Sequence, residues 1–92
     1  MRKIEQEMVE AIHYGSPMHK QNTAVTWEGN DPRRGTVSLH GNVIATVSSG
    51  TIHPWPETFR RFPTATTASR LRALGIDARI IGGRATINGK YI

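Results

Sequence analysis

Apolar residues recur at helical spacing in the first part of the chain. The apolar positions run from Ile4 to Ile12, and the sequence Tyr14-Gly15 followed by Ser-Pro is a helix stop. The pattern predicts an amphipathic helix over residues 3–14. Its opposite face, which we expect to be solvated, carries Glu5, Gln6, Glu10 and His13.

A second helical stretch follows Pro63, which blocks any helix arriving from the residues before it because it has no N–H. Thr64 or Thr66 is a suitable N-cap. Gly75 is placed to end the helix in a left-handed conformation, with a Schellman contact between Leu71 and Ile76. The apolar stripe is narrow, so we expect the helix to expose Ser69, Arg70 and Arg72.

Alternating apolar and polar residues predict a first antiparallel meander after the polar stretch 16–22. Thr23–Trp27 reads as a strand, and residues 28–35 read as a loop that carries Arg33 and Arg34. The next two strands, 36–40 and 43–47, are joined by a two-residue turn at Gly41-Asn42, and Ser48-Ser49-Gly50 closes the meander. The buried face should hold Thr23, Val25, Trp27, Leu39 and Ile44, with Leu39 opposite Ile44.

A second meander is predicted at the C-terminal end. Three short strands, 78–81, 84–87 and 90–92, are joined by Gly82-Gly83 and Asn88-Gly89, the strongest hairpin signals in the chain. In this register Ile80 lies opposite Ala85 and Arg79 opposite Thr86, and we place Arg79 and Arg84 on opposite faces.

Between the meanders lies an aromatic stretch. Pro56 suits the first position of a short helix, and Trp55, Phe59 and Phe62 supply large apolar surface. We interpret this cluster as a corner of the core; the alternative is that it stacks bases beside Arg60 and Arg61. Together the elements predict one α+β domain over residues 1–92: an N-terminal helix, an antiparallel meander, a central helix and a C-terminal antiparallel meander.

The 92 residues carry a net charge of +5, and the charge is distributed unevenly. Residues 1–59 contain five basic and six acidic side chains, whereas residues 60–92 contain seven basic side chains and Asp77 alone. A one-sided basic surface indicates a polyanionic or acidic partner, although it can also serve solubility alone. There is no cysteine, and residues 1–20 contain neither a signal peptide nor a membrane span, so we expect a protein of a reducing cytoplasm.

Three segments of the chain carry a resemblance to a known group. They are KQNTAV at 20–25, VSLHGNVIATV at 37–47 and FRRFPTATTASRLRALGIDA at 59–78. The chain resembles small accessory proteins of short-tailed, T7-like bacteriophages, and the similarity covers most of its length. The resemblance implies the cytoplasm of an infected bacterium as the setting and transfers no catalytic residue.

No constellation of residues indicates catalysis, and we expect neither a metal nor a cofactor. The four histidines are scattered without metal-ligand spacing. Outside the first helix the acidic residues are few and give no paired carboxylates: Glu28, Asp31, Glu57 and Asp77.

Two binding hypotheses remain, with self-association as a third. The first is contact with the phosphate backbone of DNA or RNA. The second is that the same arginine-rich surface, with Trp55, binds an acidic surface of a host bacterial protein and inhibits or redirects it. The candidate residues are Arg60, Arg61, Thr66, Thr67, Ser69, Arg70, Arg72 and Arg84. Self-association would use the strand Lys90–Ile92, which leaves the oligomeric state open.

Overall fold

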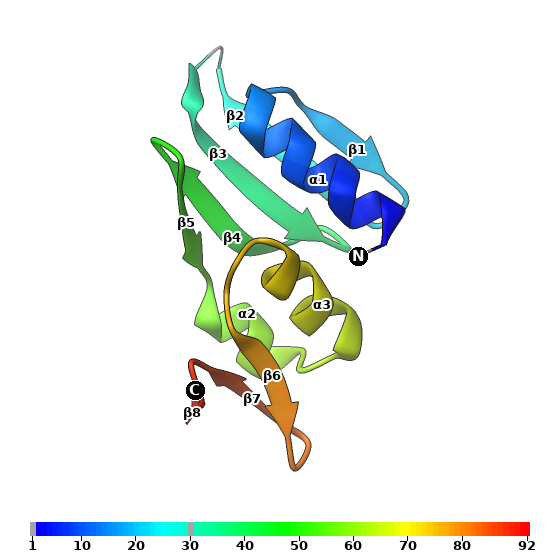
Figure 1. Ribbon diagram of the computed structural model, residues 1–92, viewed down its shortest axis with the longest axis vertical. Helices are drawn as coiled ribbons and strands as arrows, with labels where there is room; N and C mark the ends of the chain where they lie inside the picture. The colour runs from blue at the N-terminus through cyan, green and yellow to red at the C-terminus, as the bar shows by residue number, and fades with distance from the viewer. Residues whose placement is uncertain (1, 30) are drawn as a thin grey trace.

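The structure is a computed structural model that describes residues 2–29 and 31–92. Within these residues, five strands form one antiparallel sheet in the order β1-β2-β3-β4-β5, and three strands form another in the order β6-β7-β8 (Figure 1). The first helix packs on the larger sheet, and two helices connect the sheets. The elements are α1 (Lys3–Tyr14), β1 (Met18–Lys20), β2 (Thr23–Glu28), β3 (Asp31–Leu39), β4 (Asn42–Ser48), β5 (Thr51–Pro54), α2 (Pro56–Arg61), α3 (Ala65–Ala73), β6 (Ala78–Ile81), β7 (Arg84–Ile87) and β8 (Lys90–Tyr91). The predicted α+β class is confirmed.

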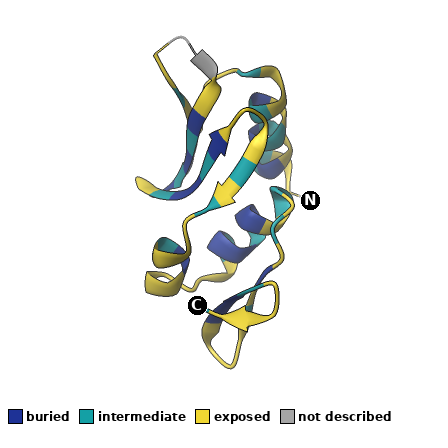
Figure 2. Ribbon diagram, turned by 90° about the vertical axis from the view of Figure 1, so that its left-hand side faces the viewer, coloured by how far each residue is buried: buried dark blue, intermediate teal, exposed yellow. Residues whose placement is uncertain are grey.

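Helix α1 has the predicted bounds and ends at Gly15, whose φ of 66° is left-handed. It buries Met8 and Ala11 and contacts β1 and β2. Figure 2 shows α1 on one side of the five-strand sheet. The opposite face of that sheet carries small polar residues, among them Thr26 and Thr36, whose hydroxyls are 2.7 Å apart.

The larger sheet extends beyond the predicted meander. Short strands β1 and β5 form the two edges of this sheet, over residues for which no strand was predicted. Strand β3 begins at Asp31 and β2 extends to Glu28, so the predicted loop 28–35 is wrong for residue 28 and for residues 31–35; Asn30 lies outside the described residues. Both Arg33 and Arg34 are exposed, as expected.

The β3–β4 turn is His40-Gly41, one residue earlier than predicted. Leu39 therefore pairs with Asn42 and not with Ile44. A β-bulge opposite Val37 and Ser38 restores the alternation, so both Leu39 and Ile44 are still buried.

Helix α3 begins at the N-cap Thr64, whose hydroxyl accepts a hydrogen bond from the Thr67 N–H at 3.1 Å. It ends in the predicted Schellman motif: the Ile76 N–H donates to the Leu71 carbonyl at 3.0 Å, next to Gly75 with a φ of 88°.

The C-terminal hairpins have the predicted turns and register, with Ile80 opposite Ala85 and Arg79 opposite Thr86. The placement of Arg79 and Arg84 on opposite faces is wrong. Arg84 pairs with Ile81, which lies two residues from Arg79, and paired residues share a face.

One continuous cluster of buried apolar side chains connects the two sheets and the three helices. It joins Met8 of α1, Val25 and Val37 of the larger sheet, Phe59 of α2 and Leu71 of α3, and it reaches Ala78 and Ala85 in the smaller sheet. None of the described helices is both long and apolar enough to span a membrane.

Candidate partner-binding surface

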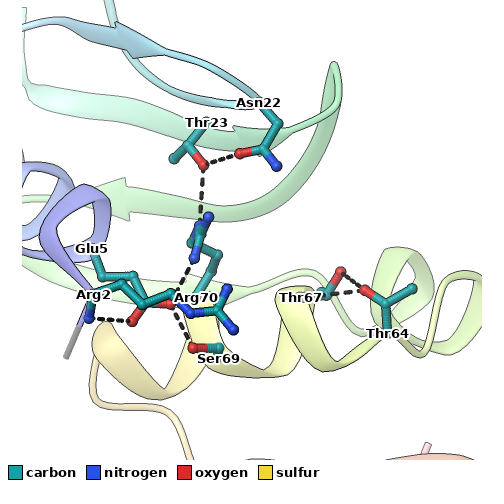
Figure 3. A network of polar contacts seen from close by, with 8 residues as sticks. All are labelled: Arg2, Glu5, Asn22, Thr23, Thr64, Thr67, Ser69 and Arg70. Atoms are coloured by element: carbon teal, nitrogen blue, oxygen red, sulfur yellow. Dashed lines mark hydrogen bonds and ion pairs between the residues drawn. The ribbon is translucent and has the colours of Figure 1, made fainter.

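The most basic helix of the sequence does not expose all of its arginines. Arg70 on α3 is only 3% exposed, because it points into the junction between α1, α3 and β2 (Figure 3). Its Nη1 donates to Oε2 of Glu5 at 2.7 Å, and its Nε donates to Oγ1 of Thr23 at 3.1 Å. The expectation that Arg70 is exposed to a partner is therefore wrong.

Glu5 is the buried counter-ion of Arg70 and not part of a solvated face, so that expectation is also wrong. The same carboxylate accepts from the Ser69 hydroxyl at 2.6 Å and from the Arg2 N–H at 3.4 Å. Burial by itself would raise the pKa of Glu5. The hydrogen bonds from Ser69 and Arg70, with the Arg2 N–H and the Arg70 charge, outweigh burial and hold this pKa below its ordinary value.

The α3 hydroxyls are likewise used inside the molecule. Thr67 is buried and its Oγ1 lies 2.9 Å from that of Thr64, while Ser69 is half-buried against Glu5. The expectation of exposed hydroxyls fails for Thr67, and Thr66 is half-buried. The first turn of α3 is capped by its own side chains.

Helix α2 and the residues at its two ends expose the arginine and aromatic side chains that a partner could contact. Trp55 is 47% exposed and Phe62 is 43% exposed, whereas Phe59 between them is fully buried. The interpretation of this cluster as a core corner is therefore correct for Phe59 and wrong for the other two. We call the exposed set Trp55, Arg60, Arg61 and Phe62 the arginine–aromatic surface.

The backbone at the two ends of α2 explains why Phe59 is buried while Trp55 and Phe62 are exposed. Trp55 is the N-cap and Phe62 the C-cap, and both have non-helical backbone angles (φ −103°, ψ 92° and φ −127°, ψ 74°). At helical spacing, residues 55, 59 and 62 would share one stripe. Because the two outer residues leave the helix, their side chains leave the stripe that buries Phe59. Pro54, Pro56 and Pro63 next to these residues are the signal in the sequence that the helix is this short.

Four side chains of the arginine–aromatic surface line one shallow hollow of about 480 Å³, which is completed by Asn42, Glu57 and Thr58. The Arg61 guanidinium lies 5.8 Å from the centre of the Phe62 ring. Arg60 and Arg61 are exposed, and no described carboxylate forms an ion pair with either. The hollow thus combines two guanidinium groups, the Glu57 carboxylate and two accessible ring systems, and its charged side chains sum to a net positive charge.

The remaining predicted residues lie on or near the smaller sheet. Arg72 is exposed and donates from Nη1 to the Ala78 carbonyl at 2.8 Å. Arg79 forms an exposed ion pair with Asp77 at 2.8 Å. Arg84 is exposed, and its guanidinium lies 4.2 Å from the centre of the Tyr91 ring. The structure therefore places Arg60 and Arg61 together on the exposed side of α2 and leaves Arg84 accessible on β7, which contacts α2. Arg70 is buried and is no longer a candidate for partner binding.

The fold and this surface define a small α+β protein with an exposed arginine and aromatic patch and no cluster of three or more potential metal ligands among its described residues. Its sequence matches the family model described as Kyanoviridae Gp96 protein over residues 1–90. The chain belongs to this family of cyanophage proteins. The phage origin implied by the resemblance is thereby confirmed, and the description of the family does not place it among short-tailed phages. No curated protein and no solved structure matches the chain.

Proposed function

We propose that this phage protein is a non-catalytic accessory protein that binds nucleic acid through the arginine–aromatic surface. The observation that carries the proposal is the exposure of Trp55 and Phe62 beside Arg60 and Arg61 around one hollow. Exposed aromatic rings next to unpaired guanidinium groups are the two parts from which nucleic-acid grooves are built.

The charge distribution supports this proposal even when the arginines that form ion pairs within the protein are left out of the count. Arg70 is neutralised by Glu5, and Arg79 by Asp77, so the positive charge available to a partner in residues 60–92 is that of Arg60, Arg61, Arg72, Arg84 and Lys90. Phosphate oxygens accept hydrogen bonds from guanidinium groups without requiring a particular base. We therefore propose binding that is sensitive to salt and tolerant of sequence.

A second candidate function is binding to an acidic surface of a host protein. Exposed tryptophan and arginine are the residues most enriched at energetically important positions of protein interfaces, and Trp55 with Arg60 and Arg61 meets that description. A pull-down from host lysate with and without nuclease separates the two candidates. One stoichiometric protein that survives nuclease treatment supports this second function.

Fluorescence anisotropy with labelled DNA and RNA oligonucleotides tests the proposed function. Arg60→Glu/Arg61→Glu should weaken binding at least about tenfold, since two phosphate contacts are lost and two repulsive charges are added. The matched control is Lys3→Glu/Arg34→Glu, which changes the net charge equally at two exposed positions outside α2.

An equal loss of affinity in both double variants would mean that only the net charge matters and would contradict a binding surface on α2. An absence of binding by the wild-type protein at low salt to every oligonucleotide would overturn the proposed function.

A further inference from the structure

A second pair of arginine and aromatic side chains lies on the smaller sheet. The Arg84 guanidinium covers the Tyr91 ring at 4.2 Å, and Tyr91 is 52% exposed. Tyr91 pairs with Thr86 on β7, and Arg84 lies two residues from Thr86, so the two side chains share one face of the sheet. No described carboxylate forms an ion pair with Arg84.

This second pair belongs to elements next to the arginine–aromatic surface. Helix α2 contacts β7 directly, although Phe62 and Tyr91 are far apart in the sequence. Figure 1 shows α2 above β7 and β8 at the C-terminal end of the chain. The fold thus gathers Arg61 with Phe62 and Arg84 with Tyr91 at one end of a molecule whose longest extent is 40 Å.

We infer that the ligand is a single-stranded nucleic acid, bound along a track that runs from the arginine–aromatic surface over Arg84 and Tyr91. This inference rests on the proposed function and specifies its partner. The track offers three accessible rings, those of Trp55, Phe62 and Tyr91, and an arginine guanidinium lies beside the rings of Phe62 and Tyr91.

Unpaired bases explain this arrangement better than a duplex. A ring gains from a nucleic acid by stacking on the face of a base, and in a duplex those faces are covered by neighbouring base pairs. A duplex would use the arginines alone.

The test compares single-stranded and duplex oligonucleotides of equal length in anisotropy titrations at fixed salt, using the wild-type protein, Tyr91→Ala and Tyr91→Phe. The wild type should bind the single strand at least about tenfold more tightly than the duplex. Tyr91→Ala should lose about fivefold or more of the single-strand affinity, while Tyr91→Phe, which keeps a ring, should retain it.

Intrinsic tryptophan fluorescence gives an independent readout. Trp55 is exposed, whereas Trp27 is half-buried over Gly35 and donates from Nε1 to the Ser16 carbonyl at 2.8 Å. A stacked base should therefore quench mainly Trp55, and Trp55→Phe should remove the quenching by a single strand.

The outcomes separate this inference from the proposed function. Equal affinity for duplex and single strand, or full single-strand affinity in Tyr91→Ala, would overturn the single-stranded track and leave nucleic-acid binding in place. Failure to bind either form at low salt would overturn both. A circular dichroism spectrum like that of the wild type confirms that Tyr91→Ala is folded.

Discussion

Arg70 on α3 and the two arginines on α2 have opposite environments in this protein. Arg70 of α3 is 3% exposed and bound by Glu5 and Thr23, whereas Arg60 and Arg61 of α2 face solvent beside two exposed rings. The three residues lie within eleven positions of one another in the sequence. The environment of each is decided by which element packs against its helix.

The difference shows that basic residues in one stretch of sequence can have separate roles. At the α1–α3–β2 junction the Arg70 guanidinium replaces water with two hydrogen-bonding groups, Glu5 and Thr23, both on elements far away along the chain. On α2 the guanidinium groups keep their solvent shell and remain available to a partner. We therefore expect α3 substitutions to affect stability and α2 substitutions to affect binding, and the following predictions run from the largest expected change in unfolding free energy to the smallest.

Arg70→Met should lower the free energy of unfolding by about 3–5 kcal/mol, because it leaves the Glu5 carboxylate buried without its guanidinium partner. Denaturant unfolding followed by circular dichroism measures the change. The matched control is Arg60→Met, which removes an exposed arginine and should shift the value by no more than about 0.5 kcal/mol.

Glu5→Gln added to Arg70→Met should recover part of this loss, since a buried amide costs less than a buried unpaired charge. A double variant that is no more stable than Arg70→Met alone would contradict the assignment of the loss to the stranded carboxylate.

Low pH should lower the free energy of unfolding through the Glu5–Arg70 ion pair. The pKa of Glu5 is lowered in the folded state, so its ionised form contributes stability above the unfolded pKa, and this contribution is lost as the pH falls through the folded pKa. Unfolding curves across the acidic range should show a steeper loss of stability for the wild type than for Glu5→Gln. Parallel pH profiles for the two proteins would show that Glu5 does not carry the dependence.

Thr64→Ala should cost about 1 kcal/mol, because it removes the acceptor for the Thr67 N–H at the start of the helix that holds Arg70. Thermal unfolding measures the loss. Thr66→Ala is the control: Thr66 lies inside the first turn and its side chain does not cap, so its replacement should be close to neutral. A larger loss at Thr66 than at Thr64 would contradict the observed cap.

Arg60→Gln/Arg61→Gln should change the unfolding free energy by less than about 0.5 kcal/mol, since both side chains are exposed. The same variant should flatten the dependence of log affinity on log salt by about 1.4 for a single strand, if each arginine neutralises one phosphate. Titrations at several salt concentrations measure this slope. An unchanged slope would remove Arg60 and Arg61 from the proposed interface.

The local features of the fold were readable from the sequence, because neighbouring residues determine them. The bounds of α1, the Thr64 cap, the Schellman motif at Gly75 and the C-terminal hairpins all follow from short-range backbone chemistry. The errors in the larger sheet arose where pairing with a distant strand decides the outcome. Strands β1 and β5 and the β3–β4 bulge lack a strong local signal and are stabilised by the neighbours they pair with.

For the candidate site, what the sequence predicts and what only the tertiary structure decides can be separated residue by residue. The sequence by itself determined that the excess of basic charge lies after residue 59, that Pro56 and Pro63 mark the starts of α2 and α3, and that Arg60 and Arg61 lie between two phenylalanines. Only the tertiary structure decided that Arg70 is internal and that Trp55 and Phe62 are external. The physical reason is that the partner of Arg70, Glu5, is 65 residues away, and that a helix of six residues with non-helical caps buries Phe59 alone. The ion pair between Arg70 and Glu5 is a contact between two polar side chains on distant helices, and the apolar pattern of neither helix indicates it.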